Sequence, residues 1–129
     1  RRVLSAEKLM ELCDLVRRVP VGDSAYEFAL AIVRATRPNE AGASDFVRHW
    51  LSWGAGPRAG QFLILAAKAR ALLLGRLHVI SEDIEAAAAP VLRHRLVTSF
   101  NAQAEGVTIE QIIEKIITLV PRGPGKKLL

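Results

Sequence analysis

Apolar side chains recur at intervals of three and four residues along most of the chain, a pattern typical of helices that bury one face. The first predicted helix starts near Ser5, a suitable N-cap, and ends at Pro20. Its apolar positions are Leu9, Leu12, Cys13, Val16 and Val19. Because Cys13 lies within this stripe, we expect it to be a small core residue.

The second predicted helix opens with a capping box, Ser24 to Glu27, and ends before Pro38. A polar turn over residues 39–43 separates it from a short third helix that starts near Ser44. Each of these helices gathers its apolar residues on one face: Phe28, Ala31, Ile32 and Ala35 in the second, and Phe46, Val47, Trp50 and Leu51 in the third.

The longest predicted helix covers residues 57–74, and only Gln61 and Lys68 form its polar stripe. A helix with so narrow a polar stripe is covered by protein on most sides, so we expect it to be central. Gly75 is expected to end it.

The last third of the chain predicts two further helices, the first of which contains Pro90. Residues 77–80 are compatible with an extended segment, and Ser81 is expected to cap the helix that follows. Pro90 should end that helix or open a short piece over residues 91–96. The final helix has a capping box, Thr108 to Gln111, and an apolar face formed by Ile109, Ile112, Ile113, Ile116, Ile117 and Val120.

These elements predict an all-α fold, a small bundle of five or six helices over residues 5–120. With 129 residues, the chain is long enough for one domain with its own core. Because it begins without Met, we expect a piece of a longer protein, with residues 1–4 a linker from a missing upstream domain. Residues 121–129, rich in Pro and Gly, are expected to be a flexible tail.

Composition narrows the class of protein only slightly. The net charge of +5 permits an anionic partner but selects none. The single cysteine excludes an internal disulfide, and a reducing cytoplasm is the simplest location. Lys68 and Arg70 interrupt the longest apolar stretch, residues 62–74, so we expect no membrane span.

The sequence shows no motif or residue spacing typical of catalysis or metal binding. It holds no Gly-x-x-x-x-Gly-Lys-Ser/Thr phosphate loop. The histidines, at positions 49, 78 and 94, do not have the spacing of metal ligands. Glu82, Asp83 and Glu85 are interpreted as acids favoured at a helix start. We therefore expect neither a catalytic residue nor a metal site in this chain.

Arg58 is the one strong candidate for a binding residue. It follows Gly54, Gly56 and Pro57 at the start of the longest helix, and Pro is well suited to the first helical position. The helix dipole, the free first-turn amides and a guanidinium would converge there, and the glycines would let the backbone bend and a ligand approach. This combination predicts an anion site, with phosphate the best match for the arginine. The alternative is an ordinary helix start with a solvated arginine.

Several segments in order resemble the C-terminal helical lid of MoxR-type AAA+ ATPases, and the likeness extends from about Ser5 to Val120. The segments are Val33-Arg34-Ala35-Thr36-Arg37-Pro38, Trp53-Gly54-Ala55-Gly56-Pro57-Arg58-Ala59, Ala66-Ala67-Lys68-Ala69-Arg70-Ala71-Leu72, Gly75-Arg76, Val79-Ile80-Ser81-Glu82-Asp83-Ile84 and Pro90-Val91-Leu92-Arg93-His94-Arg95-Leu96. The resemblance implies that Arg58 is the sensor-2 arginine, which reaches toward the phosphates of ATP. Gly56 departs from the Ser or Asn usual in the family.

The resemblance also implies the other domain, the oligomeric state and the partners of the full-length protein. ATP and Mg²⁺ would be held mainly by an upstream AAA+ large domain, and the fragment alone would not be an enzyme. A homo-oligomer, usually a hexameric ring, would perform chaperone-like assembly or maturation of partner complexes, often beside a von Willebrand factor A-domain protein. The roles of Arg93 and Arg95 stay open.

Two other functions compete with this interpretation. A DNA-binding helical module is compatible with the basic charge, but no predicted helix has a dense Lys/Arg face, so we expect no nucleic acid partner. A helical interaction module without any nucleotide role would leave Arg58 in solvent.

Overall fold

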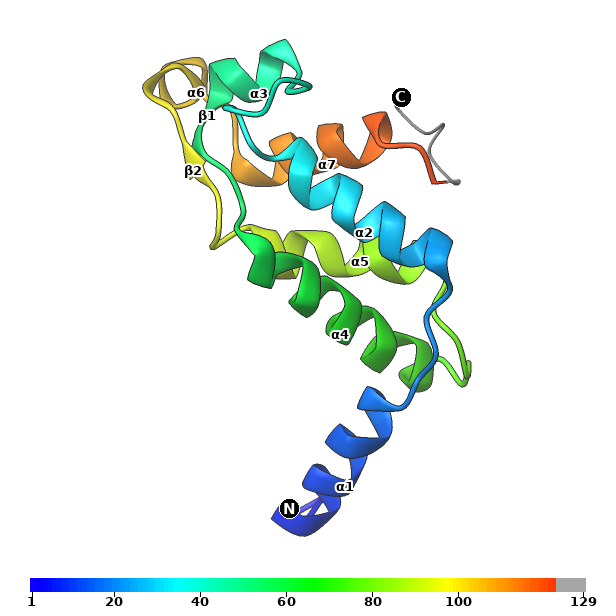
Figure 1. The fold of residues 1–129 in the computed structure, drawn as a ribbon. Helices are drawn as coiled ribbons and strands as arrows, with labels where there is room; N and C mark the ends of the chain where they lie inside the picture. The colour runs from blue at the N-terminus through cyan, green and yellow to red at the C-terminus, as the bar shows by residue number, and fades with distance from the viewer. Residues whose placement is uncertain (123–129) are drawn as a thin grey trace.

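The computed structural model describes residues 1–122, and the fold is helical, as predicted (Figure 1). Within this range there are seven helices and one short two-stranded ribbon. They are α1 (Ala6–Arg17), α2 (Asp23–Ala35), α3 (Asp45–Trp50), β1 (Leu51–Trp53), α4 (Pro57–Leu73), α5 (Ser81–Leu92), β2 (Val97–Thr98), α6 (Phe100–Glu105) and α7 (Ile109–Leu119). The ribbon and α6 were not predicted.

The core lies between α2, α4, α5 and α7, and α4 is central to it, as its narrow polar stripe predicts. The most extensive helix contact is between α4 and α5, where both helices bury alanines: Ala59, Ala67 and Ala71 in α4, and Ala87 and Ala88 in α5. Small side chains let two helices approach closely, and larger residues fill the remaining space. The fully buried ones include Phe28, Ile32, Leu63, Ile84, Leu92 and Ile112.

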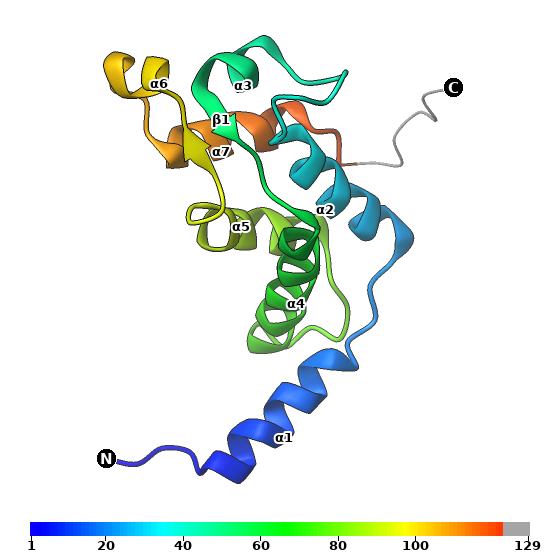
Figure 2. The same cartoon turned by 60° about the vertical axis from the view of Figure 1, so that its left-hand side comes forward.

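The remaining elements lie on opposite sides of this core (Figures 1 and 2). On one side, α3, α6 and the antiparallel β1–β2 ribbon form a small lobe in which Leu51 pairs with Thr98 and Trp53 with Val97. On the other side, α1 projects away from the body. The ribbon therefore leads directly into the start of α4, where the candidate site is.

The prediction that Cys13 belongs to the core is wrong. Helix α1 forms as expected, with Ser5 accepting a hydrogen bond from the Lys8 amide at 3.1 Å. However, none of its residues is buried, and Cys13 is exposed. The helix meets the body at its C-terminal end, where the Lys68 ammonium donates to the Arg17 carbonyl at 3.0 Å. An amphipathic pattern predicts a helix without identifying what covers its apolar face.

Two helix starts differ from the prediction. Helix α2 begins at Asp23 after Gly22 and has no side-chain cap, so the capping box from Ser24 does not form. In α5 the N-cap is Ile80 instead of Ser81, and its amide donates to the Asp83 carboxylate at 3.0 Å. The capping box of α7 is confirmed, with Thr108 and Gln111 exchanging hydrogen bonds of 2.9 and 3.3 Å.

The prediction that Pro90 ends α5 is also wrong, because the helix continues to Leu92 and no separate helix forms over residues 91–96. Proline removes one backbone hydrogen bond, but Val91 and Leu92, which follow it, are both buried. Their packing holds the last turn in place. Gly75 ends α4 as predicted, in the left-handed conformation with φ of 74°. Residues 77–80 form no strand.

The domain boundaries expected near residues 5 and 120 stay a prediction. Residues 1–4 are all exposed. Within the expected tail, Arg122 is fixed to α5 by an ion pair with Glu85, Nε to Oε1 2.6 Å, while residues 123–129 lie outside the described range. Across residues 1–122, no helix has the length and apolar character needed to cross a membrane.

Candidate functional site

Arg58 lies in the first turn of α4, where the sequence places it. Pro57 occupies the first helical position, and the N-cap residue Gly56 has no side chain that can accept a hydrogen bond from the first turn. Arg58 is exposed and forms no side-chain hydrogen bond or ion pair with another residue between 1 and 122. A free guanidinium therefore stands at the positively polarised end of a 17-residue helix.

The loop before Arg58 is fixed to the end of α2 by two hydrogen bonds, and a third orients the hydroxyl that makes one of them. The hydroxyl of Thr36, which is fully buried, donates to the Val33 carbonyl at 2.6 Å and accepts from the Ala55 amide at 2.9 Å. Nε of Arg37 donates to the Ala55 carbonyl at 3.0 Å. Both backbone polar groups of Ala55 are thus satisfied by residues nearly twenty positions earlier, which holds the start of α4 in place.

The two predicted site glycines have different surroundings. A Cβ at Gly54 would lie 2.5 Å from the Thr36 carbonyl oxygen and 2.7 Å from the Arg37 Cα, so glycine is required for this backbone contact. A Cβ at Gly56 would meet no atom within 4 Å, and its φ of −81° is open to any residue. Gly54 therefore has a packing role, and nothing in the local backbone requires a glycine at position 56.

Glu40 balances the positive charge beside this loop. Its carboxylate accepts hydrogen bonds from Arg37, NH1 to Oε1 3.0 Å, and from Arg34, Nε to Oε2 3.2 Å. The hydrogen bond from Arg37 lowers the pKa of Glu40 most, and the bond from Arg34 adds to the effect. Both arginines are thereby ion-paired, although they share one negative charge, and Arg58 is the arginine of this region without an ion-pair partner among the described residues.

A cavity of about 350 Å³ opens between the loop after α2 and the loop from β1 to α4. It is lined by Arg37, Pro38, Asn39, Glu40, Ser52, Trp53, Gly54, Ala55, Gly56 and Pro57. Sequence reasoning selected Arg58 and its three neighbours Gly54, Gly56 and Pro57, but missed the contributions of Thr36, Arg37 and Trp53. The Thr36-Arg37-Pro38 segment was recognisable as part of the family resemblance, although its contact with Ala55 was not.

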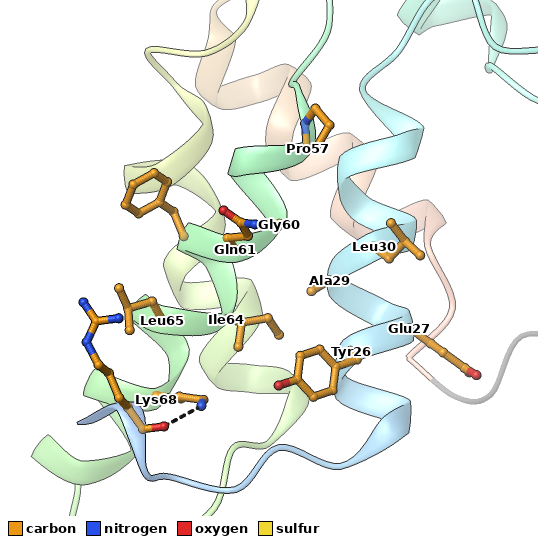
Figure 3. A pocket seen from close by; sticks show the side chains of 12 residues that line it. Tyr26, Glu27, Ala29, Leu30, Pro57, Gly60, Gln61, Ile64, Leu65 and Lys68 are labelled. Atoms are coloured by element: carbon orange, nitrogen blue, oxygen red, sulfur yellow. Dashed lines mark hydrogen bonds between the residues drawn. The ribbon is translucent and has the colours of Figure 1, made fainter. Parts of the chain in front are cut away.

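A larger groove, about 840 Å³, lies between α2 and α4 (Figure 3). Tyr26 and Ala29 of α2 lie on the side of Ile64 of α4, and Lys68 closes one end through its bond to the Arg17 carbonyl. Pro57 is at the other end, so this groove begins next to the candidate site.

The acidic residues of α5 have structural partners. Asp83 is fully buried and accepts hydrogen bonds from Arg76, NH1 to Oδ2 2.6 Å, and from Arg70, NH1 to Oδ1 2.7 Å. The hydrogen bonds from Arg76 lower the pKa of Asp83 most, and those from the Ile80 amide and Arg70 add to the effect. The interpretation of Asp83 as an acid favoured at a helix start agrees with its hydrogen bond from the Ile80 amide. It did not include the ion pairs with Arg70 and Arg76. Glu82 and Glu85 both pair with Arg122.

The other polar candidates also bond within the domain. His49 lies 2.6 Å from Glu105, Nε2 to Oε1, which links α3 to α6. Arg95 donates to the Val91 carbonyl and lies over the Phe62 ring, 4.9 Å from its centroid, while Arg93 donates to the Ala89 carbonyl. Among the described residues, no three His, Cys, Asp or Glu side chains are arranged to hold a metal ion.

Comparison with known proteins matches this geometry to one family. Residues 47–116 match the AAA lid domain family. The chain is 34% identical over 121 residues to the chaperone MoxR1 of Mycobacterium tuberculosis, covering 93% of this chain and 32% of that protein. It is 32% identical over 118 residues to the uncharacterized protein YeaC of Bacillus subtilis, covering 92% of this chain and 34% of that protein.

A solved structure agrees in both fold and sequence. The fold superposes on a protein of Cytophaga hutchinsonii described as a proposed ATPase, with a TM-score of 0.85, 32% identity and coverage of 94% of this chain and 37% of that one. The chain thus spans about a third of the length of each relative. Since the family match covers more than half of the chain and includes Arg58, this helical domain belongs to the AAA lid domain family, as a lid of the MoxR-type AAA+ ATPases.

Proposed function

We propose that this lid binds ATP through Arg58 and couples its hydrolysis to movement of the lid. The observation that carries the proposal is the free, exposed guanidinium of Arg58 at the start of α4, next to a loop that residues 36 and 37 hold in place. The groups present fit a polyphosphate, because a guanidinium and a helix N-terminus both favour a negative ligand.

In this proposal, Arg58 pairs with the γ-phosphate and favours the closed arrangement of lid and large domain. Bound Mg–ATP supplies the negative charge that Arg58 recognises. Arg58 loses this partner after hydrolysis, and the lid is then free to rotate. Only a difference in the affinity of Arg58 for triphosphate over diphosphate can shift the balance between the two arrangements. The phosphate loop, the magnesium-binding acids and the arginine finger would belong to the AAA+ large domain or to a neighbouring subunit.

The same proposal extends to the whole protein as an ATPase with a chaperone-like role in the assembly or maturation of partner complexes. The relative named chaperone MoxR1 supports this role. A hexameric ring, a cytoplasmic location and a von Willebrand factor A-domain partner are further parts of the proposal that rest on the family alone.

The charge distribution disfavours the DNA-binding alternative. Arg34 and Arg37 pair with Glu40, and Arg70 and Arg76 pair with Asp83. Two carboxylates thus offset half of the charge of four arginines, which leaves fewer free cations for a phosphate backbone, and binding to DNA depends on such cations. The remaining alternative is an interaction module without a nucleotide role. Substitution of Arg58 distinguishes it from our proposal.

The test is steady-state ATP hydrolysis by the full-length protein carrying Arg58→Ala. We expect at least a ten-fold loss, because a hydrogen bond to a charged group contributes about 1.5–3 kcal/mol. Arg58→Lys should recover part of the activity, since it keeps the charge but not the planar fork. The matched control is Arg48→Ala, which removes another exposed arginine, in α3. Unchanged hydrolysis in Arg58→Ala would favour the interaction module.

A further inference from the structure

A second groove, of about 600 Å³, lies where α5 and α7 pack against each other, and it shares no residue with the candidate site. Its apolar lining is formed by Ala89 of α5 and by Ile113, Ile117 and Val120. Ile113 and Val120 are buried in the core, while Ala89 and Ile117 are only partly buried. The groove therefore exposes the outer surface of the hydrophobic core.

Acidic side chains surround this apolar surface, although the whole chain has a net charge of +5. Glu85 comes from α5, and Glu110 and Glu114 come from α7. Side chains four residues apart on a helix lie on the same face, with Cβ atoms about 5–6 Å from each other. The groove thus combines an apolar floor with carboxylates from both helices, two of them one helical turn apart.

Arg122 shows how a basic side chain fits against this groove. It contributes to the lining, and its guanidinium contacts Glu85 at two points, Nε to Oε1 2.6 Å and Nη2 to Oε2 2.8 Å. This two-point contact is a strong geometry for pairing arginine with a carboxylate. Since Glu85 is already paired, a further cation would have to bind to the carboxylates of α7.

The two carboxylates of α7 are available for such a cation. Arg93 approaches Glu110 only to 4.0 Å, Nη1 to Oε1, and both side chains are more than half exposed. Glu114 is exposed and makes no hydrogen bond or ion pair with another residue between 1 and 122. Its neighbour Lys115 lies over the Phe46 ring of α3, 4.6 Å from the centroid, so this ammonium is held on another side of α7.

We propose that the α5–α7 groove docks an amphipathic helix of a partner protein. Apolar side chains of that helix cover Ile113 and Ile117, and lysines or arginines spaced four residues apart pair with Glu110 and Glu114. Insertion of the apolar face of a helix into a groove is a recurrent mode of peptide recognition, and the matching interval of four residues follows from helix geometry. Charge selects the partner, because an acidic helix would be repelled. The proposal does not depend on Arg58 or on nucleotide binding.

The test uses a fluorescently labelled synthetic helix of about 15 residues, a length at which helices begin to be stable in water, titrated with the full-length protein. The probe has leucines on one face and lysines at the four-residue interval. We expect saturable binding, measured by anisotropy, that weakens as salt is added. The double variant Glu110→Lys/Glu114→Lys should bind about ten-fold more weakly, because two attractive contacts become repulsive.

A second probe, with glutamates in place of the lysines, guards against a variant that has simply unfolded. It should bind the double variant more tightly than it binds the native protein, a gain that unfolding does not produce. The matched control is Glu7→Lys/Glu11→Lys, which reverses two exposed glutamates at the same spacing on α1, one of them also in a first helical turn. It changes the net charge equally and should leave the affinity for the lysine probe unchanged.

Several results would overturn the proposal. An equal loss in the α1 control would mean that only the overall charge attracts the probe. Equal binding of a probe with alanines in place of leucines would mean that the apolar floor takes no part. Tighter binding after deletion of residues 123–129, which include Lys126 and Lys127, would mean that the chain's own end occupies the groove. Self-association of the protein that the lysine probe reverses would identify the occupant as a second copy of the chain.

Discussion

At the scale of single residues, Gly54 and Gly56 show that glycines in one loop can serve different purposes. The Gly54 Cα faces the backbone of Thr36 and Arg37, which cannot retreat without breaking the hydrogen bonds to Ala55. Beside Gly56 there is open space, and this residue is the N-cap of α4.

Two substitutions test this difference. Gly54→Ala should lower the free energy of unfolding by about 1–3 kcal/mol, the usual cost of forcing an extra methyl into a filled space. Gly56→Ser should be neutral or raise it by a few tenths of a kcal/mol, roughly the difference between these residues as N-caps. Chemical denaturation of the purified variants measures both. Equal stability of the two variants would mean that the backbone at residues 36–37 yields to the added methyl.

At the scale of elements, α5 continues past Pro90 although proline disfavours a helix interior. Pro90 has no N–H to donate to the carbonyl four residues earlier, and it is exposed, while the next two residues are buried. Packing of the last turn therefore outweighs local preference.

Pro90→Ala should raise the free energy of unfolding by about 1–3 kcal/mol, because alanine restores the missing hydrogen bond and has the higher helix propensity. Thermal unfolding measures this change. The control is Ala86→Ser, a substitution at an exposed position of the same helix that restores no hydrogen bond. A loss of stability in Pro90→Ala would show that the proline ring makes a contact that outweighs the hydrogen bond.

The sequence predicted the long elements well and the short ones poorly. Helix α7 has strong periodicity and helix α4 is a long, nearly continuous apolar run; both have clear signals at their ends, so their bounds could be read directly. The six residues of α6 and the two of β2 are too few for a pattern. They are held by contacts distant in sequence, such as the bond from the Ser99 hydroxyl to the His49 carbonyl at 2.6 Å.

The candidate site likewise has residues that the sequence predicted and contacts that it did not. Arg58 and Pro57 were predictable because helix starts have local rules. The contact of Gly54 and Ala55 with residues 36 and 37 depends on how α2 packs beside α4, which no local rule specifies.

At the scale of the whole molecule, Asp83 joins α4, the loop after it and the start of α5. Its two guanidinium partners come from Arg70 in α4 and Arg76 in the loop. Breaking a buried ion pair costs about 3–5 kcal/mol. Because Arg70 and Arg76 both partly reach solvent, we expect a cost of about 2–3 kcal/mol for Asp83→Asn at pH 7.

The lowered pKa of Asp83 makes this contribution depend on pH. A carboxyl whose pKa is lower in the folded state stabilises the protein fully above its ordinary pKa of about 3.9, and the contribution is lost as pH falls through the folded value. Denaturation midpoints measured from pH 5 down to pH 2 should fall more steeply for the native protein than for Asp83→Asn. Parallel slopes would show that other carboxyls, such as Glu40 and Glu105, dominate the acid response.

The hydrogen bonds to both sides of Ala55 have a mechanical consequence. A loop between a strand and a helix ordinarily bends under load, but this one is fastened at its midpoint to the end of α2. A pull on Arg58 is therefore transmitted to α2 and α4 together instead of being absorbed by the loop. In the proposed mechanism, in which the nucleotide acts on the lid through Arg58, this stiffness decides how much of the displacement reaches the rest of the lid.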